Sequence, residues 1–210
     1  MLRHLFIFFI LALPLTVSCQ IIDTDYKNQI KVSALRLINI INPGIEISYE
    51  RFHKLYLSSE VSVGYATNVI GKPHNHLKGY SIGFEEKYFV KMHPNSRKYF
   101  SLDFNCNNIN YEETTSGRDT INNVTIIDPF TVVRKSLSLS FRYGLQFYRK
   151  QFVLDLNIGA GMKYRNVKHH DRIFEYKRSP EPFDFIRNAN LETNGFVFFL
   201  PVNIRLGYRF

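Results

Sequence analysis

The sequence predicts an all-β fold, an eight-stranded antiparallel up-and-down transmembrane β-barrel, and three observations support this prediction. Apolar and polar residues alternate with a period of two through eight runs, as they do along strands that have two different faces. Short and long connections mostly alternate along the chain, which is typical of barrels that cross a membrane. Beyond the N-terminal segment, no apolar stretch has the about 20 residues that a membrane helix needs. The chain can therefore cross a bilayer only with strands.

The N-terminal segment, residues 1–19, is predicted to be a cleaved signal peptide. It has a positive start, an apolar run too short for a membrane helix and a small-residue stretch that leads to Gln20. We expect cleavage before Gln20, which leaves residues 20–210 as one domain. In an alternative, Cys19 becomes the acylated first residue of a lipoprotein, although Thr16 stands where such processing sites usually have Leu or Val.

Charge and cysteine content exclude several classes of protein. The formal net charge is +9, but the basic residues are scattered rather than gathered on one face, so no nucleic-acid partner is predicted. Without the signal peptide, Cys106 is the one remaining cysteine, and no intrachain disulfide can form. We interpret Cys106 as a packing residue. No catalytic, cofactor-binding or metal-binding motif stands out, and none is predicted.

The eight predicted strands span residues 30–41, 44–52, 55–67, 77–90, 97–111, 131–149, 151–168 and 195–210. The clearest alternation is in residues 136–148, where leucines and aromatic residues alternate with serine, arginine, glycine and glutamine. The first run is the least regular, because residues 35–38 do not alternate, and we expect a bulge or a two-sided environment there. Glu86 is a second irregularity, since it falls on the same face as Ile82 and Phe84.

The connections indicate which end of each strand lies where. They are short after the second, fourth and sixth predicted strands and longer after the third, fifth and seventh, the longest lying around residues 170–194. The first connection, around residues 42–44, is a short exception. Several runs exceed the about 9–11 residues of a tilted membrane strand, whereas globular strands have about 5–6. We expect the polar face of each strand to line the interior and the apolar face to contact lipid.

The last predicted strand ends on a characteristic pattern. Leu206, Tyr208 and Phe210 share one face, and the printed sequence stops on the aromatic ring of Phe210. This ending resembles the C-terminal signal by which outer-membrane barrels are recognised for insertion. It implies the barrel-assembly machinery as a partner during insertion.

Three segments carry a resemblance to a known class of proteins. They are residues 42–50, with the sequence Asn-Pro-Gly-Ile-Glu-Ile-Ser-Tyr-Glu, residues 57–65, and residues 200–210. On these segments the chain resembles the small outer-membrane barrels of the OmpA/OmpX kind and, more narrowly, an uncharacterised outer-membrane family of Bacteroidota classed as a domain of unknown function. The resemblance covers nearly all of the mature chain. It implies a bacterial outer-membrane location with the lipid bilayer as partner, and no established activity. The absence of Trp leaves Tyr and Phe to form the interfacial girdles.

Charged residues on the inward face form a candidate network inside the barrel: Glu46, Glu60, Asp155, Arg142 and Arg205. An eight-stranded barrel has an interior about wide enough for side chains to fill, and unpaired charges there are costly. We therefore predict a polar plug, with a gated ion path or a proton-linked site as the alternative. A wide pore is excluded, because porins use about 16 strands or more.

The longest predicted loop is the candidate interaction site. It carries Phe174, Tyr176, Phe183 and Phe185 among balanced charges, and loop aromatics either cover a barrel mouth or contact a partner. We predict a non-enzymatic role in envelope structure or surface interaction, with an extracellular protein or glycan as a possible ligand. The alternatives are a lipid-modifying enzyme and a narrow channel.

Two weaker patterns bear on these alternatives. A serine hydrolase uses a serine, a histidine and an acid, and the sequence has these residue types close together in His53, Ser58, Ser59 and Glu60. Alternation, however, puts Ser59 and Glu60 on opposite faces of the strand. That placement argues against a catalytic triad.

Histidines in two long loops could bind Zn²⁺ or Cu²⁺, but no preset geometry is expected there and we interpret them as solvated. These loop histidines are His74, His76, His169 and His170.

Overall fold

The computed structural model describes residues 26–37, 43–68, 75–119, 124–172 and 193–210, and the predicted signal peptide lies outside them. The elements in chain order are β1 (Asn28–Ser33), α2 (Ala34–Leu37), β2 (Gly44–Lys54), β3 (Leu57–Ala66), β4 (Asn75–His93), β5 (Ser96–Asp119), β6 (Val124–Arg149), β7 (Phe152–His170), β8 (Thr193–Phe199) and β9 (Val202–Arg209). Among these residues no helix is both long and apolar enough to cross a membrane.

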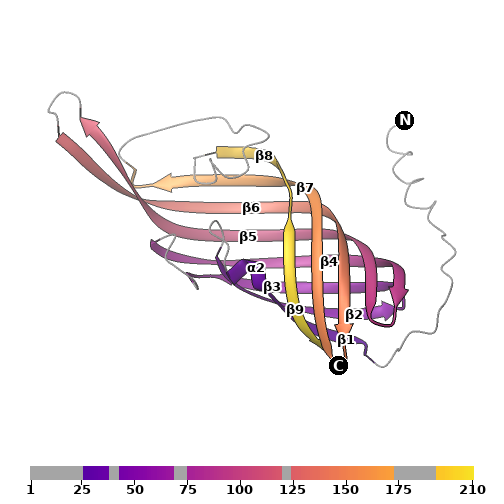
Figure 1. The fold of residues 1–210 in the computed structure, drawn as a ribbon. Helices are drawn as coiled ribbons and strands as arrows, with labels where there is room; N and C mark the ends of the chain where they lie inside the picture. The colour runs from indigo at the N-terminus through magenta and orange to yellow at the C-terminus, as the bar shows by residue number, and fades with distance from the viewer. Residues whose placement is uncertain (1–25, 38–42, 69–74, 120–123, 173–192) are drawn as a thin grey trace, which may run out of the picture.

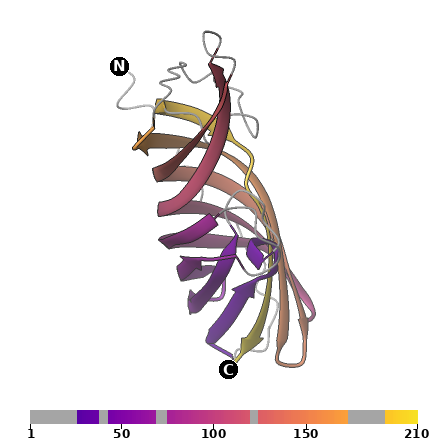
Figure 2. The same ribbon diagram turned by 90° about the vertical axis from the view of Figure 1, so that its left-hand side faces the viewer.

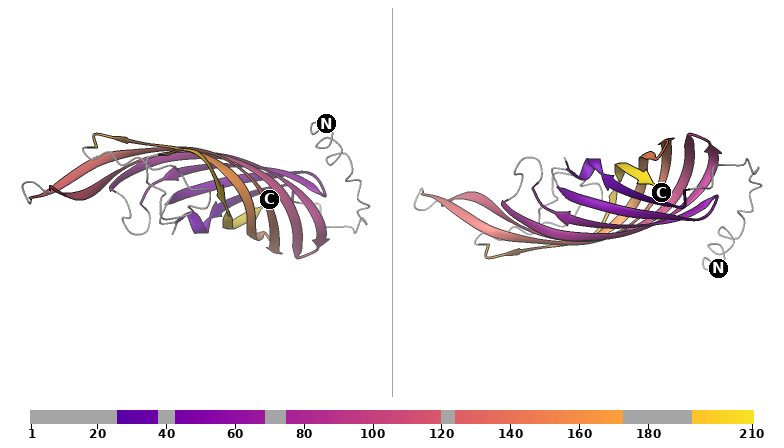
Figure 3. Two further views of the ribbon diagram at one scale, coloured as in Figure 1. Left: turned by 90° about the horizontal axis from the view of Figure 1, so that it is seen from above. Right: turned by 90° about the horizontal axis from the view of Figure 1, so that it is seen from below.

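The strands form one antiparallel sheet that closes on itself. Each strand from β1 to β7 pairs with the next one along the chain. The segments β8 and β9 follow one another along β7, and β9 pairs back with β1. The result is a closed ring of eight strands (Figure 1; Figure 3 views it from above and below). The prediction of an all-β fold with eight antiparallel strands that close into a ring is confirmed.

The two faces of the sheet differ sharply in chemistry. On β2, burial alternates strictly from Gly44 to Arg51. The outward Ile47 is 53% exposed, whereas the inward Glu50 is 0% exposed. The same alternation continues around the ring, so that apolar side chains cover its exposed outer face and polar or charged side chains fill most of its interior. This is the reverse of a water-soluble domain, which buries its apolar side chains.

The first predicted strand, residues 30–41, is wrong over residues 34–37. β1 ends at Ser33 and the chain turns into the short helix α2, so neither a bulge nor a two-sided strand accounts for the broken alternation. The turn directs Arg36 into the ring, where its Nη1 lies 2.5 Å from both Glu46 Oε2 and Ser81 Oγ. The connection between β1 and β2 therefore begins at residue 34, earlier than predicted.

The fifth and sixth strands are longer than predicted. Residues 112–130 were expected to be mostly loop, but β5 and β6 pair continuously from Ser96 with Phe147 to Asp119 with Val124. The two strands extend as a hairpin beyond the rest of the ring (Figures 1 and 2). Propensity alone does not explain the extension, because Gly117, Asp119 and Pro129 lie among the Thr and Ile residues; the continued pairing of the two segments keeps them as strands.

The last predicted strand, residues 195–210, is interrupted. β8 ends at Phe199 and β9 begins at Val202, with Leu200 and Pro201 between them. Proline has no backbone N–H and cannot donate to a ladder. Its carbonyl still accepts a hydrogen bond of 2.9 Å from the Gly159 backbone N–H, so β8 and β9 stay aligned along β7.

Candidate functional site

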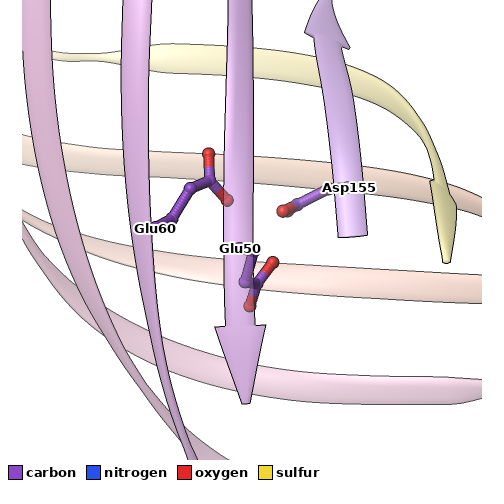
Figure 4. A group of neighbouring side chains, drawn as sticks. All are labelled: Glu50, Glu60 and Asp155. Atoms are coloured by element: carbon purple, nitrogen blue, oxygen red, sulfur yellow. The ribbon is translucent and has the colours of Figure 1, made fainter. Parts of the chain in front are cut away.

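The centre of the ring holds a cluster of charges that come from five different strands. Alternate residues point inward on every strand, so the closed ring brings together Lys31 of β1, Glu50 of β2, Glu60 of β3, Lys87 of β4 and Asp155 of β7. All five side chains are at most 1% exposed. We call these five residues the central cluster. Figure 4 shows how its three carboxylates lie around one small space.

Two ammonium groups are shared among three carboxylates. Lys31 Nζ bonds Glu50 Oε2 and lies 2.8 Å from Glu60 Oε2 and 2.6 Å from Asp155 Oδ2. Lys87 Nζ contacts the same three oxygens at 3.3, 2.6 and 2.9 Å. An ammonium group has three donors, so each lysine can use all three on the three carboxylates. The cluster thus joins opposite sides of the ring.

The carboxylate trio has the composition of a cation site. Oxygens of Glu50, Glu60 and Asp155 lie within 4.8 Å of one another, and such oxygens are the ligands that Ca²⁺ and Mg²⁺ prefer. The two ammonium groups, however, already lie against all three of these oxygens. The lysines therefore supply the positive charge that a metal ion would otherwise supply.

Neutral donors complete the central cluster. The Tyr99 hydroxyl donates to Asp155 Oδ1 at 2.6 Å. Gln146 Nε2 donates to Glu50 Oε2 at 2.9 Å and to Asp155 Oδ2 at 3.0 Å, and the Ser58 hydroxyl donates to Glu50. Hydrogen bonds from all sides keep these carboxylates paired, which is what buried charges require.

Arginines extend the network toward the long connections. Arg205 Nη1 lies 2.8 Å from Glu60 Oε1 and 2.7 Å from Glu85 Oε2. Arg142 Nη2 lies 2.5 Å from Asp103 Oδ2. The described ion pairs inside the ring involve six carboxylates and five cations, so the network is close to neutral. The carboxylates are those of Glu46, Glu50, Glu60, Glu85, Asp103 and Asp155. The cations are those of Lys31, Arg36, Lys87, Arg142 and Arg205.

Packed rings close the interior at the end with the short turns. The Arg97 guanidinium carbon lies 4.9 Å from the centre of the Phe52 ring and 5.1 Å from that of Tyr148. The Arg209 guanidinium carbon lies 4.9 Å from the centre of the same Tyr148 ring. These guanidinium groups stack on aromatic faces in the manner of cation–π pairs. We call this layer the aromatic floor.

An apolar cluster lies at the opposite end of the interior. Its members are inward residues near the long connections: Ala66, Leu77, Ile109, Tyr111, Phe130, Val132 and Val167. The interior is thus layered, with the aromatic floor, the charged network and this apolar cluster following one another between the two ends.

The structure places the five predicted network residues inside the ring, each at most 8% exposed. Glu60, Asp155 and Arg205 belong to one connected group, whereas Arg142 joins it through Glu85 and Glu46 through Arg205 at 3.9 Å. Sequence reasoning missed Lys31, Arg36, Tyr99 and Gln146. Lys31 could have been found, because it alternates with the outward Ile30 and Val32.

The other predicted residues fall in two groups. Leu206, Tyr208 and Phe210 lie on the outer face, 43–56% exposed. The predicted interaction loop, with Phe174, Tyr176, Phe183 and Phe185, lies outside the described residues.

A serine, a histidine and an acid do meet on the outer face, but the acid is Glu86 rather than the Glu60 considered from sequence. His53 Nε2 lies 2.8 Å from Ser59 Oγ, and the Ser59 hydroxyl donates to Glu86 Oε2 at 2.5 Å. A carboxylate can only accept, so the one hydroxyl proton of Ser59 goes to Glu86 and His53 must donate its own proton to Ser59. The imidazole is then not placed to take the serine proton, as a general base would.

The prediction that the histidines lie in loops is wrong for His76, which is on β4, and for His169 and His170, which are on β7, whereas His74 lies outside the described residues. Those described have separate partners. His76 Nδ1 lies 2.6 Å from Glu112 Oε2, and His169 packs on the Phe130 ring with centroids 4.9 Å apart. In the part of the chain that the structure describes, the one cluster with metal-ligand geometry is the carboxylate trio of the central cluster.

Comparisons with protein-family models, with curated proteins and with solved structures found no match to this chain.

Proposed function

We propose that this chain is an integral β-barrel of the bacterial outer membrane, with a closed polar interior and a non-enzymatic role. The observation that carries the proposal is the distribution of polarity: apolar side chains are exposed around the outside of a closed ring, and a paired charge network is buried within it. Exposed apolar surface on this scale is unfavourable in water and favourable in lipid. The ring closes through the β1–β9 pair, which satisfies the strand edges there as a bilayer requires, whereas β8 pairs with β7 alone among the described strands.

The interior supports a plug rather than a channel. An ion crossing the ring would have to pass the aromatic floor and then separate lysines and carboxylates that lie 2.6–3.3 Å apart. Breaking a buried ion pair by removing one partner costs about 3–5 kcal/mol. A path through the central cluster would break several such pairs together.

The longer connections are the proposed site of the biological role. In this proposal the short turns lie on the periplasmic side and the longer connections face outward, which is the usual arrangement in barrels of this type. The role is structural support of the envelope or binding of an extracellular protein or glycan. The direction of the hydrogen bonds at Ser59, from His53 to Ser59 and from Ser59 to Glu86, favours this role over lipid hydrolysis. The resemblance to small outer-membrane barrels of Bacteroidota agrees with it, as do a cleaved signal peptide and insertion by the barrel-assembly machinery.

The test is electrophoresis of the detergent-extracted outer-membrane fraction, loaded unboiled and boiled, with mass spectrometry of the mature N-terminus. We expect a heat-dependent change in mobility and a chain that starts at Gln20. Recovery of a water-soluble periplasmic protein without a mobility change would refute the proposal. A lipid-modified Cys19 would leave the barrel intact but replace the predicted cleavage site.

A further inference from the structure

Basic residues are concentrated at the short-turn end of the ring. The exposed cations there lie just before β1, on the ends of β2, β4, β5 and β6, and in the turn after β6: Lys27, Arg51, Lys54, Lys91, Lys98, Arg149 and Lys150. In the described part of this end, Glu86 is the one acidic side chain outside the interior. The other end mixes signs, since the exposed Glu112 and Asp171 lie there among its basic residues. The short-turn end therefore carries a positive field.

A hollow of about 450 Å³ lies within this positive end, at the start of β1 and the end of β2. Its lining combines two long basic side chains, an imidazole and polar or aromatic groups: Lys27, Asn28, Tyr49, Arg51, Phe52 and His53. The Tyr49 hydroxyl donates to Asn28 Oδ1 at 2.7 Å, which holds two of these lining groups together. We call this hollow the basic hollow.

The donors of the basic hollow are available to a ligand. The structure describes no ion pair for Lys27 or Arg51, and both side chains are exposed. His53 is held in place by the chain of hydrogen bonds through Ser59 to Glu86. A neutral imidazole carries one N–H, so with Nε2 donating to Ser59 the Nδ1 of His53 can only accept. The donors that an anion could use in the basic hollow are therefore Lys27 and Arg51.

The basic hollow lies where the apolar outer face ends. Ile30 and Ile47, on the same two strands, are 45% and 53% exposed, whereas the next outward positions toward the turn are polar or basic. In a membrane barrel this boundary coincides with the headgroup layer of the leaflet. Phosphate groups lie in that layer, and guanidinium groups bind phosphate with paired hydrogen bonds.

We infer that the basic hollow binds the phosphate of an anionic phospholipid in the leaflet at the short-turn end. The inference rests on the proposed membrane function. It adds a specific lipid site, whose donors are Lys27 and Arg51, on the side opposite the long connections.

The test is native mass spectrometry of the folded protein in detergent micelles, with phosphatidylglycerol or phosphatidylcholine added at equal concentration. We expect more bound phosphatidylglycerol than phosphatidylcholine, and a roughly tenfold or larger loss of that preference in the variant Lys27→Gln/Arg51→Gln, because each basic residue contributes appreciably to binding at an anionic surface. The matched control is Lys78→Gln/Lys135→Gln, which removes the same charge from exposed outward positions nearer the other end. It should keep the preference.

Each outcome has a distinct meaning. An unchanged preference in the hollow variant, or an equal loss in the control, would overturn the site. Displacement of the lipid by millimolar inorganic phosphate alone would show that the hollow recognises free phosphate rather than a lipid. A heat-dependent mobility shift recorded on the same samples reports the barrel separately. Its absence in the wild type would refute the proposed function, and its presence without lipid preference would refute only the lipid site.

Discussion

Removing the carboxylate of Asp155 is the sharpest perturbation of the interior. Four donors meet this side chain: Lys31 Nζ at 2.6 Å, Lys87 Nζ at 2.9 Å, the Tyr99 hydroxyl at 2.6 Å and Gln146 Nε2 at 3.0 Å. In Asp155→Asn the shape is kept, but the negative charge is lost and an amide NH₂ replaces one acceptor. Two buried ammonium groups then face two carboxylates of the central cluster instead of three.

The expected cost follows from these contacts. Removal of one partner from a buried ion pair costs about 3–5 kcal/mol, and an unsatisfied buried donor costs about 1–3 kcal/mol. Because Glu50 and Glu60 still hold both lysines, we expect the lower part of this range, a loss of about 3 kcal/mol in the free energy of unfolding. The double variant Asp155→Asn/Lys31→Met also removes one of the two ammonium groups that lost a partner, so it should recover about 1–2 kcal/mol of that loss.

The assay is a urea titration of the protein folded in lipid vesicles or micelles, followed by far-UV circular dichroism and by the mobility of unheated samples. Agreement of the two probes checks that one transition is measured. Met162→Leu is the matched control, because it lies on the outer face of the same strand, is 59% exposed and keeps its volume. A loss below about 1 kcal/mol in Asp155→Asn, or a double variant less stable than the single one, would refute the argument that Lys31 and Lys87 depend on Asp155 as a partner.

Three further predictions follow from the same structure. Gly144→Ala should destabilise the fold by about 1–3 kcal/mol in the same titration, because a Cβ there would meet the ring of Tyr99, whose hydroxyl holds Asp155; an unchanged midpoint would contradict this close packing. Ser59→Ala should leave phospholipid ester hydrolysis at the level of the wild type and of a protein-free blank, since His53 donates to Ser59 rather than accepting from it; turnover that disappears with Ser59 would show that the site is catalytic. The purified wild-type protein should give no steady single-channel conductance in planar bilayers at neutral pH, because the aromatic floor and the central cluster fill the interior; reproducible steps that survive repeated purification would support the channel alternative.

Sequence reasoning worked best where alternation alone decides the outcome. A strand turns every second side chain to the same face, so the inward placement of Glu46, Glu60, Asp155, Arg142 and Arg205 could be predicted without knowing any partner. It failed where local geometry departs from a strand. The turn at Ala34–Leu37 and the break at Pro201 depend on how each segment fits its neighbours, and the long β5–β6 hairpin depends on continued pairing between two segments that each looked like loop.

The serine cluster shows the same limit. Sequence proximity suggested Glu60 as the acid beside His53 and Ser59, and alternation correctly placed Glu60 on the other face. Glu86, 27 residues away from Ser59 in the chain, lies directly opposite it across the β3–β4 pair. Its position on an otherwise apolar face was visible in the sequence as an irregularity, but its partner depends on strand register.

By itself, the sequence determined the all-β class, the eight alternating strands and the chemistry of each face, because all three follow from side-chain alternation along a single strand. Only the tertiary structure decided which charges meet. Lys31 and Asp155 are 124 residues apart in the chain, and Lys87 and Asp155 are 68 apart. Their contact depends on closure of the ring, on the register of every pair of strands between them and on an interior narrow enough for side chains from opposite walls to touch. These are cooperative properties of the whole sheet, and no local pattern encodes them.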